Sequence, residues 1–144
     1  MTLLRVSPAD AYRLMCDEGY AYVDVRTVAE FDSGHPSGAY NVPIAIPGSG
    51  PLEENPDFLR VMTAVFARDQ ALVLGCKSGN RSLRAARSLV EAGFVRVVEQ
   101  RAGYGGVRDA FGRVTEAGWV ALNLPCATRG EPEREYAALR LRAG

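Results

Sequence analysis

The chain has 144 residues, of which 47% are hydrophobic and 24% are charged, and this composition is that of one ordinary globular domain with a normal core. Its 17 basic and 17 acidic residues give a formal net charge of zero, so the charge balance predicts no nucleic-acid partner and no membrane partner. The longest apolar runs have the length of strands, which excludes a membrane-spanning helix of about 20 apolar residues.

Predicted strands and helices alternate along the first half of the chain. Ser7 and Pro8 are typical of a helix start, Gly19 of a helix end, and Thr27 with Glu30 of a capping box. The elements predicted in order are a strand at 3–6, a helix at 8–18, a strand at 20–25, a short helix at 27–32, a strand at 39–44 placed at an edge by Pro43, and a surface loop at 45–55.

The second half continues the alternation and contains the most informative segment. The predicted elements are a helix after Asn55-Pro56 with Phe58, Met62, Val65 and Phe66 on its apolar face, a strand at 71–75, a helix at 81–92 that stops at Gly93, a strand at 95–98, a further helical pattern after Gly106, and a terminal helix in the charged tail after Arg129. Strands separated by helices predict an α/β sandwich, a parallel sheet covered on both faces. Residues 1–144 are interpreted as one domain, with a core at about 3–125 and a tail at 126–144.

Cys76 lies at the carboxyl end of a predicted strand, where ligands bind in this class of fold. A tight loop and a helix start follow it, and such a loop points backbone N–H groups toward a bound anion. We therefore expect the Cys76 thiol to ionise more readily than an isolated one and to act as a nucleophile. The candidate binding residues are those of the loop: Lys77, which is the only lysine in the chain, Ser78, Gly79, Asn80, Arg81 and Ser82.

The other cysteines have no such surroundings. Cys16 and Cys126 have no cationic neighbours, and we interpret them as core residues or bystanders. Three cysteines and one histidine, with no metal-ligand spacing, predict reduced thiols and no metal site. The N-terminal segment enters a strand pattern at once, so we expect a cytoplasmic protein.

The loop Cys-Lys-Ser-Gly-Asn-Arg-Ser resembles the Cys-x-x-Gly-x-Arg-Ser active loop of rhodanese-type sulfurtransferases. Three other stretches resemble segments of that family, and together the matches cover about residues 5–125. They are Asp24-Val-Arg26 followed by Glu30-Phe31, Gly34-His35 followed by Gly38-Ala-Tyr-Asn41-Val-Pro43, and Gly93-Phe94 followed by Val97 and the glycines from Gly103 to Gly106. Pro36 replaces an aliphatic residue of the family pattern, and a tryptophan that often follows the glycine-rich segment arrives later, as Trp119.

The resemblance implies a rhodanese fold with a five-stranded sheet and a sulfurtransferase reaction. Cys76 would take sulfur from a donor such as thiosulfate, hold it as a persulfide on the N–H groups of residues 77–82, and pass it to cyanide, a thiol or a sulfur-relay protein, with no cofactor. Asp24 and Arg26 are interpreted as supporting residues in an ion pair that ties a loop to the sheet, and His35 as a turn residue.

Two alternatives stay open. A phosphatase or arsenate reductase of the same fold would resemble a loop with five residues between cysteine and arginine, whereas four separate Cys76 from Arg81. A non-catalytic rhodanese module used for binding or sensing is the other alternative, against which the intact cysteine and the basic loop argue.

Overall fold

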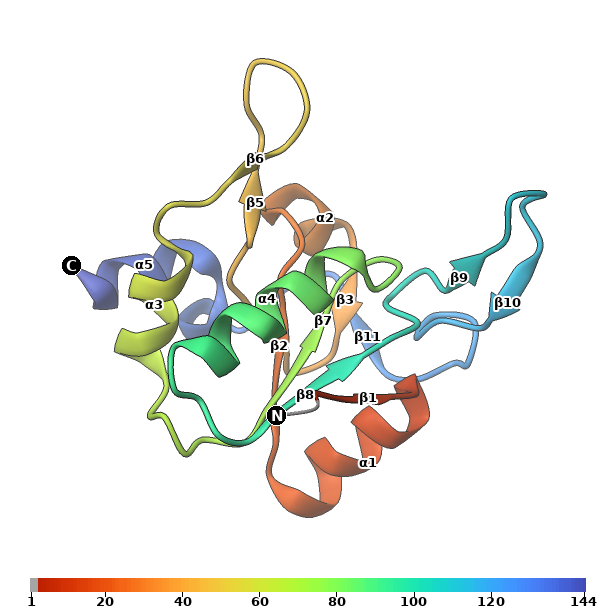
Figure 1. The fold of residues 1–144 in the computed structure, drawn as a ribbon, viewed down its shortest axis with the longest axis horizontal. Coiled ribbons are helices and arrows are strands. Elements are labelled where there is room, and N and C mark those ends of the chain that lie inside the picture. Colours follow the sequence, from red (N-terminus) through yellow and green to blue (C-terminus); the bar gives the residue numbers. More distant parts are fainter. Residues whose placement is uncertain (1–2) are drawn as a thin grey trace.

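A parallel five-stranded sheet forms the centre of the computed structural model, which describes residues 3–144 (Figure 1). The strand order is β1-β8-β7-β2-β4, and every neighbouring pair is parallel. The strands are β1 (Leu4–Val6), β2 (Ala21–Asp24), β4 (Tyr40–Asn41), β7 (Leu72–Gly75) and β8 (Val97–Gln100). The predicted α/β class is confirmed, and β4 lies at the sheet edge, where Pro43 after it interrupts no ladder.

Helices cover the sheet, and their ends carry the signals expected from the sequence. They are α1 (Pro8–Glu18), α2 (Val28–Ser33), α3 (Phe58–Val65), α4 (Asn80–Glu91), the 3-10 helix η1 (Pro132–Arg134) and α5 (Tyr136–Ala143). Ser7 caps α1 by accepting a hydrogen bond from the Asp10 N–H at 3.1 Å, and Thr27 with Glu30 forms the predicted capping box at α2. Within residues 3–144, no helix is both long enough and apolar enough to cross a bilayer.

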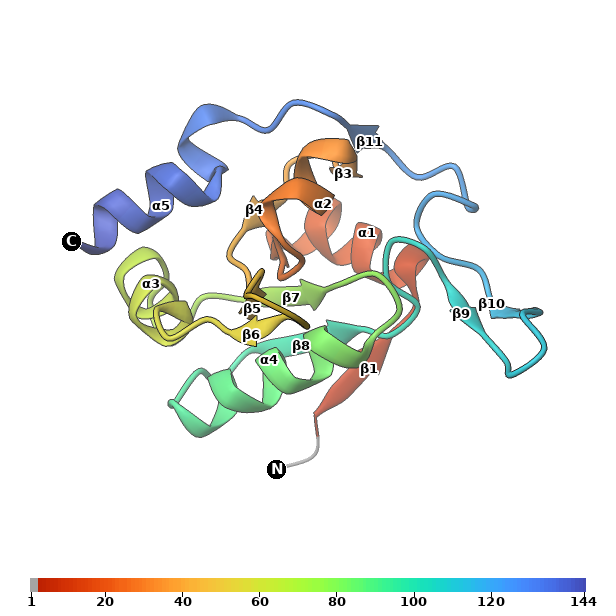
Figure 2. The ribbon, with the colours of Figure 1, turned by 90° about the horizontal axis from the view of Figure 1, so that it is seen from above.

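Alternate side chains of the strands build two separate cores. Val23, Leu72 and Leu74 lie in one cluster with buried residues of α3, α4 and α5. Tyr22, Val73 and Val98 lie in the other cluster, together with Trp119 and with Ala11 of α1. Helices α1 and α4 lie on opposite faces of the sheet (Figure 2). The period of two along each strand thus assigns neighbouring residues to different faces, and this sorting decides which side chains stand behind the loop that follows β7.

The largest differences from the sequence prediction are in two segments. The helical pattern expected after Gly106 is instead a projecting hairpin of β9 (Val107–Arg108) and β10 (Val114–Glu116) (Figure 1). Asp109 accepts hydrogen bonds from the N–H groups of Phe111 and Arg113, which closes the turn. The predicted surface loop at 45–55 does project from the fold, but its base is a small hairpin of β5 (Ala45–Ile46) and β6 (Glu53–Glu54).

The C-terminal tail packs on the domain. Strand β11 (Cys126–Ala127) pairs with β3 (His35–Pro36), and α5 packs against α3. Leu139 of α5 is completely buried in the cluster on that face, while Trp119 is completely buried in the other cluster and donates its indole N–H to the carbonyl of Pro125. Residues beyond 125 therefore contribute to the core.

Candidate active site

Glycines fix the path of the chain around Cys76. A Cβ atom on Gly75, the last residue of β7, would overlap the hydroxyl of Tyr22. Gly79, at the start of α4, has a φ of 99°, and a Cβ there would overlap the carbonyl oxygen of Arg101. Both positions accept only glycine, because one needs a left-handed backbone and both lack space for a side chain. The strand, the turn and the helix start are consequently held close to the sulfur.

The Cys76 sulfur has two hydrogen-bonding neighbours. The Gly79 N–H donates to Sγ at 3.1 Å, and the Ser82 hydroxyl oxygen lies 3.3 Å from Sγ. Cys76 is only 2% exposed, and it stands at the N-terminal end of α4, where the helix dipole favours a negative charge. Of the loop residues named from the sequence, Gly79 and Ser82 are the two that the structure brings onto the sulfur.

The segment after β8 holds the loop from outside. The Tyr104 N–H donates to the carbonyl of Cys76 at 2.7 Å, and the Gly105 N–H donates to the carbonyl of Lys77 at 2.9 Å. Gly103 packs so closely on these two peptide units that a Cβ atom on it would overlap the Lys77 carbonyl and lie 2.7 Å from the Cys76 oxygen. The carbonyl groups of the loop are thereby occupied by this segment, while the Gly79 N–H remains directed at the sulfur.

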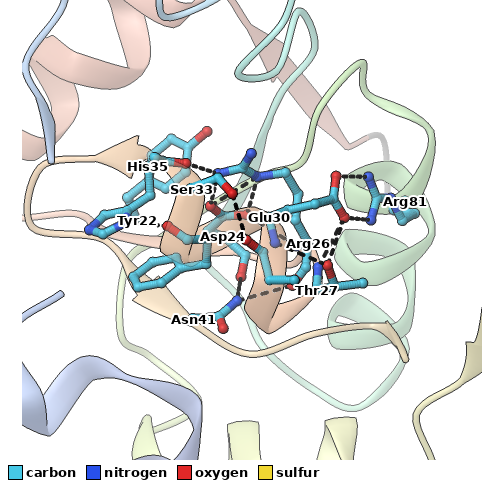
Figure 3. Close-up of polar contacts among 12 residues, drawn as sticks. Tyr22, Asp24, Arg26, Thr27, Glu30, Ser33, His35, Asn41 and Arg81 are labelled. Atoms are coloured by element: carbon cyan, nitrogen blue, oxygen red, sulfur yellow. Dashed lines mark hydrogen bonds and ion pairs between the residues drawn. The ribbon is translucent and has the colours of Figure 1, made fainter. Parts of the chain in front are cut away.

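Arg81 is held by a carboxylate. Its guanidinium donates two hydrogen bonds to Glu30, at 2.6 and 2.9 Å (Figure 3). This arginine lowers the pKa of Glu30 to about 2, and the hydrogen bond to Glu30 raises the pKa of Arg81. Arg81 was predicted to bind substrate, and the structure places its charged group on α2. Lys77, by contrast, is exposed and has no ion pair within the described part of the chain.

Asp24 and Arg26 form a buried ion pair at the carboxyl end of β2. The Arg26 guanidinium donates to both oxygens of Asp24, with distances of 2.8 to 3.1 Å, and to the carbonyl of Gly34 at 2.6 Å (Figure 3). Asn41 donates to the carbonyls of both residues at 3.0 Å. The pair ties the chain after β2 to the turn before β3, which is the supporting role expected from the sequence.

The remaining candidates lie in packing environments or at the surface. His35 is 1% exposed, its ring stacks on Phe31 with 3.6 Å between centroids, and its Nδ1 lies 2.7 Å from the Phe31 carbonyl. Its ring is thus engaged by α2. Cys16 and Cys126 are both exposed. The Ser78 and Asn80 side chains are also on the surface of the loop.

Sequence reasoning missed two residues that stand behind the sulfur. Glu99 of β8 is completely buried, accepts a hydrogen bond from the Ser82 hydroxyl at 2.5 Å, and pairs with Arg5 Nε of β1 at 2.6 Å. Both residues come to the site through the parallel register, in which Glu99 lies between Leu74 of β7 and Arg5 of β1. A charged residue in a buried strand was the one local signal that could have drawn attention to Glu99.

Comparison with known proteins gives a consistent family. A sequence model described as "Rhodanese-like domain" matches residues 7–110. The chain is 40% identical over 97 residues to "Senescence-associated protein DIN1" of Raphanus sativus, covering 67% of this chain and 53% of that protein, so it spans about half of that relative's length. It is 42% identical over 86 residues to "Thiosulfate sulfurtransferase 16, chloroplastic" of Arabidopsis thaliana, covering 60% of this chain and 72% of that protein. The crystal structure of Rv0390 from M. tuberculosis superposes with a TM-score of 0.74 and 28% identity, over 90% of this chain and 100% of that one.

Proposed function

Because the chain belongs to the rhodanese-like domain family, we propose that it is a sulfurtransferase that carries sulfur as a persulfide on Cys76. The observation that carries this proposal is the setting of Cys76. Its sulfur lies at the carboxyl end of β7 and at the start of α4, with the Gly79 N–H 3.1 Å away. An N–H donor and a helix N-terminus both stabilise a thiolate and, after reaction, a persulfide anion.

In the first step, the Cys76 thiolate attacks the outer sulfur of a donor such as thiosulfate. A bond forms between Sγ and that sulfur, the sulfur–sulfur bond of thiosulfate breaks, and sulfite leaves with the electron pair. In the second step, cyanide or a thiolate attacks the outer sulfur of the persulfide and takes it, which restores the Cys76 thiolate. Each step exchanges one nucleophile for another at sulfur, and no cofactor takes part. A protein of a sulfur-relay pathway could serve as the acceptor.

Lys77 gives the proposed reaction its preference for anionic donors. Lys77 is exposed and directly follows the nucleophile in the chain, whereas the Arg81 guanidinium is paired with Glu30. The exposed cation attracts thiosulfate and stabilises the departing sulfite. The name of the Arabidopsis relative, a thiosulfate sulfurtransferase, supports thiosulfate as a donor.

The proposed reaction is distinguished from phosphate ester hydrolysis by the loop. Four residues separate Cys76 from Arg81, and the arginine that a phosphatase would place on its substrate pairs here with Glu30. A short loop around a nearly buried sulfur suits one sulfur atom better than a tetrahedral oxyanion. We accordingly expect no significant hydrolysis of aryl phosphates by the protein.

Steady-state assay of thiocyanate formation from thiosulfate and cyanide tests the proposal. We expect turnover by the wild type, loss of turnover in Cys76→Ser, and unchanged turnover in Cys16→Ser and Cys126→Ser, because the two exposed thiols lie outside the loop. An inactive wild-type protein that binds a ligand with unmodified Cys76 would favour the non-catalytic module instead. Efficient hydrolysis of an aryl phosphate would favour the phosphatase.

A further inference from the structure

A buried carboxylate lies directly behind the active loop, and sulfur transfer as described above does not use it. Glu99 is completely buried in β8, where an ionised carboxylate is costly unless it is paired and hydrogen-bonded. One oxygen, Oε1, accepts a hydrogen bond from Arg5 Nε at 2.6 Å, and the Arg5 side chain is 41% exposed. The pair therefore connects the interior of the site with the surface of β1.

The second oxygen of Glu99 connects to the sulfur through one hydroxyl group. Ser82 is completely buried and donates to Glu99 Oε2 at 2.5 Å, while its oxygen lies 3.3 Å from Cys76 Sγ. A serine hydroxyl has a single hydrogen and two lone pairs. With that hydrogen given to Glu99, the Ser82 oxygen can accept the hydrogen of the Cys76 thiol. The four side chains thus form one line of hydrogen-bonding contacts, from Cys76 through Ser82 and Glu99 to Arg5.

We propose that Glu99 is the proton acceptor for Cys76 and that Ser82 relays the proton. The Cys76 S–H bond breaks as its proton passes to the Ser82 oxygen, and the original Ser82 hydroxyl proton passes to Glu99 Oε2. The products are a thiolate and a neutral carboxylic acid, so the negative charge moves from oxygen to sulfur and the net charge of the buried site is unchanged. Glu99 is a positioning residue in this scheme, because it acts on the sulfur only through Ser82.

The other charged groups around the site leave this relay to Glu99. Two arginines beside the loop are already engaged in ion pairs, since Arg81 pairs with Glu30 and Arg101 pairs with Glu116. The ionisable and charged groups that face the relay are Arg5 from β1, Tyr22 and Asp24 from β2, Arg26 after β2, Lys77 and Arg81 from the loop and α4, and Arg101 after β8. Burial raises the pKa of Tyr22, so its phenol stays neutral. Glu99 is the carboxylate that accepts a hydrogen bond from Ser82.

The inference rests on the proposed role of Cys76 as the attacking sulfur, but it can be tested without a sulfur donor. The measurement is the rate of Cys76 alkylation by iodoacetamide as a function of pH. It uses a Cys16→Ser/Cys126→Ser background, in which Cys76 is the one thiol that iodoacetamide can alkylate. Two groups that share a proton titrate in two steps, so we expect two rises separated by a plateau in which a constant fraction of Cys76 is thiolate.

Glu99→Gln removes the acceptor, and we expect it to give a single rise, with alkylation at the former plateau slower by about 10-fold or more. Glu116→Gln is the matched control, because Glu116 also pairs with an arginine beside the loop, at 2.7 Å, and its carboxylate oxygens are both taken by Arg101. That variant should keep the plateau. Ser82→Ala should lose it, and Ser82→Thr, which retains a hydroxyl, should restore it.

A single rise in the parent protein, or a plateau that survives in both Glu99→Gln and Ser82→Ala, would overturn the proposal. If Glu99→Gln does not fold, the contrast between Ser82→Ala and Ser82→Thr decides the same question. Sulfur transfer and the proton relay are tested separately. A two-step alkylation profile with no persulfide after thiosulfate would reject only sulfur transfer, and a persulfide with a one-step profile would reject only the relay.

Discussion

Gly103 supports the active loop from outside, and Gly103→Ala is expected to impair both folding and catalysis. The residue has a φ of +70°, in the left-handed region, and a Cβ atom on it would overlap the Lys77 carbonyl and lie 2.7 Å from the Cys76 oxygen. Gly112, in the turn of the β9–β10 hairpin, has a φ of +80° and no heavy atom within 4 Å of its Cβ position. Gly112→Ala is therefore a matched control for the backbone cost alone.

The magnitude follows from separating these two effects. An alanine in the left-handed region costs about 1–2 kcal/mol of the free energy of unfolding, and both variants share this cost. In the contact between Gly103 and the loop, Gly103 itself is held in place. Its N–H donates to the Gln100 side chain at 2.8 Å, and its carbonyl accepts from the backbone N–H of Trp119 at 2.9 Å. The active loop must then move by several tenths of an ångström. Since a misplacement of about 1 Å can cost about 100-fold in rate, we expect a loss of about 10-fold in kcat/KM.

Urea unfolding and steady-state sulfur transfer measure the two effects on the same preparations. Gly112→Ala should lose about 1–2 kcal/mol of stability and retain wild-type kcat/KM. Gly103→Ala should lose more stability than Gly112→Ala and about 10-fold in kcat/KM. Equal stability and equal activity in the two variants would show that the 103–105 segment does not position the loop.

Three further predictions concern Lys77, the ion pair of Arg81 with Glu30, and the packing of α5. Lys77→Ala should lower kcat/KM for thiosulfate by at least ~10-fold in steady-state kinetics at fixed cyanide, because a charge-assisted contact contributes roughly 1.5–3 kcal/mol; an unchanged value would show that the lysine does not meet the donor. The Arg81 ion pair lowers the pKa of Glu30 from 4.5 to about 2, so its contribution to stability is present above pH 4.5 and is lost as the pH falls toward 2. The difference in unfolding free energy between wild type and Glu30→Gln should accordingly shrink between pH 6 and pH 3 in urea titrations, and a difference independent of pH would contradict the ion pair. Leu139→Ala should cost about 2–5 kcal/mol and Leu141→Ala less than about 0.5 kcal/mol, since the first side chain is completely buried and the second is 82% exposed; equal effects would mean that α5 does not pack as described.

The sequence predicted the features that depend on neighbouring residues. The apolar run that ends at Gly75, the glycine at 79 and the helical spacing after it are local signals, and β7, the loop and α4 lie where those signals place them. The capping box of Thr27 and Glu30 is equally local. In each of these patterns the local conformational preference of the residues agrees with the conformation that the fold requires, so tertiary packing leaves the predicted element in place.

The features that sequence reasoning missed depend on contacts between distant segments. Glu99 reaches Ser82 and Arg5 through the register of three parallel strands, which no local pattern specifies. The helical pattern predicted after Gly106 is wrong, because the segment forms a hairpin in which Phe111 is 88% exposed and no apolar face is buried. Asp109 and Gly112 are the turn signals that could have predicted the hairpin.

Peptide mass spectrometry of the protein, after exposure to thiosulfate and then to cyanide, shows directly whether Cys76 carries the sulfur. We expect thiosulfate to add one sulfur atom to the peptide containing Cys76 and cyanide to remove it, while the peptides containing Cys16 and Cys126 keep their masses. No added sulfur on any peptide, or a persulfide found mainly on Cys16 or Cys126, would show that Cys76 is not the sulfur carrier.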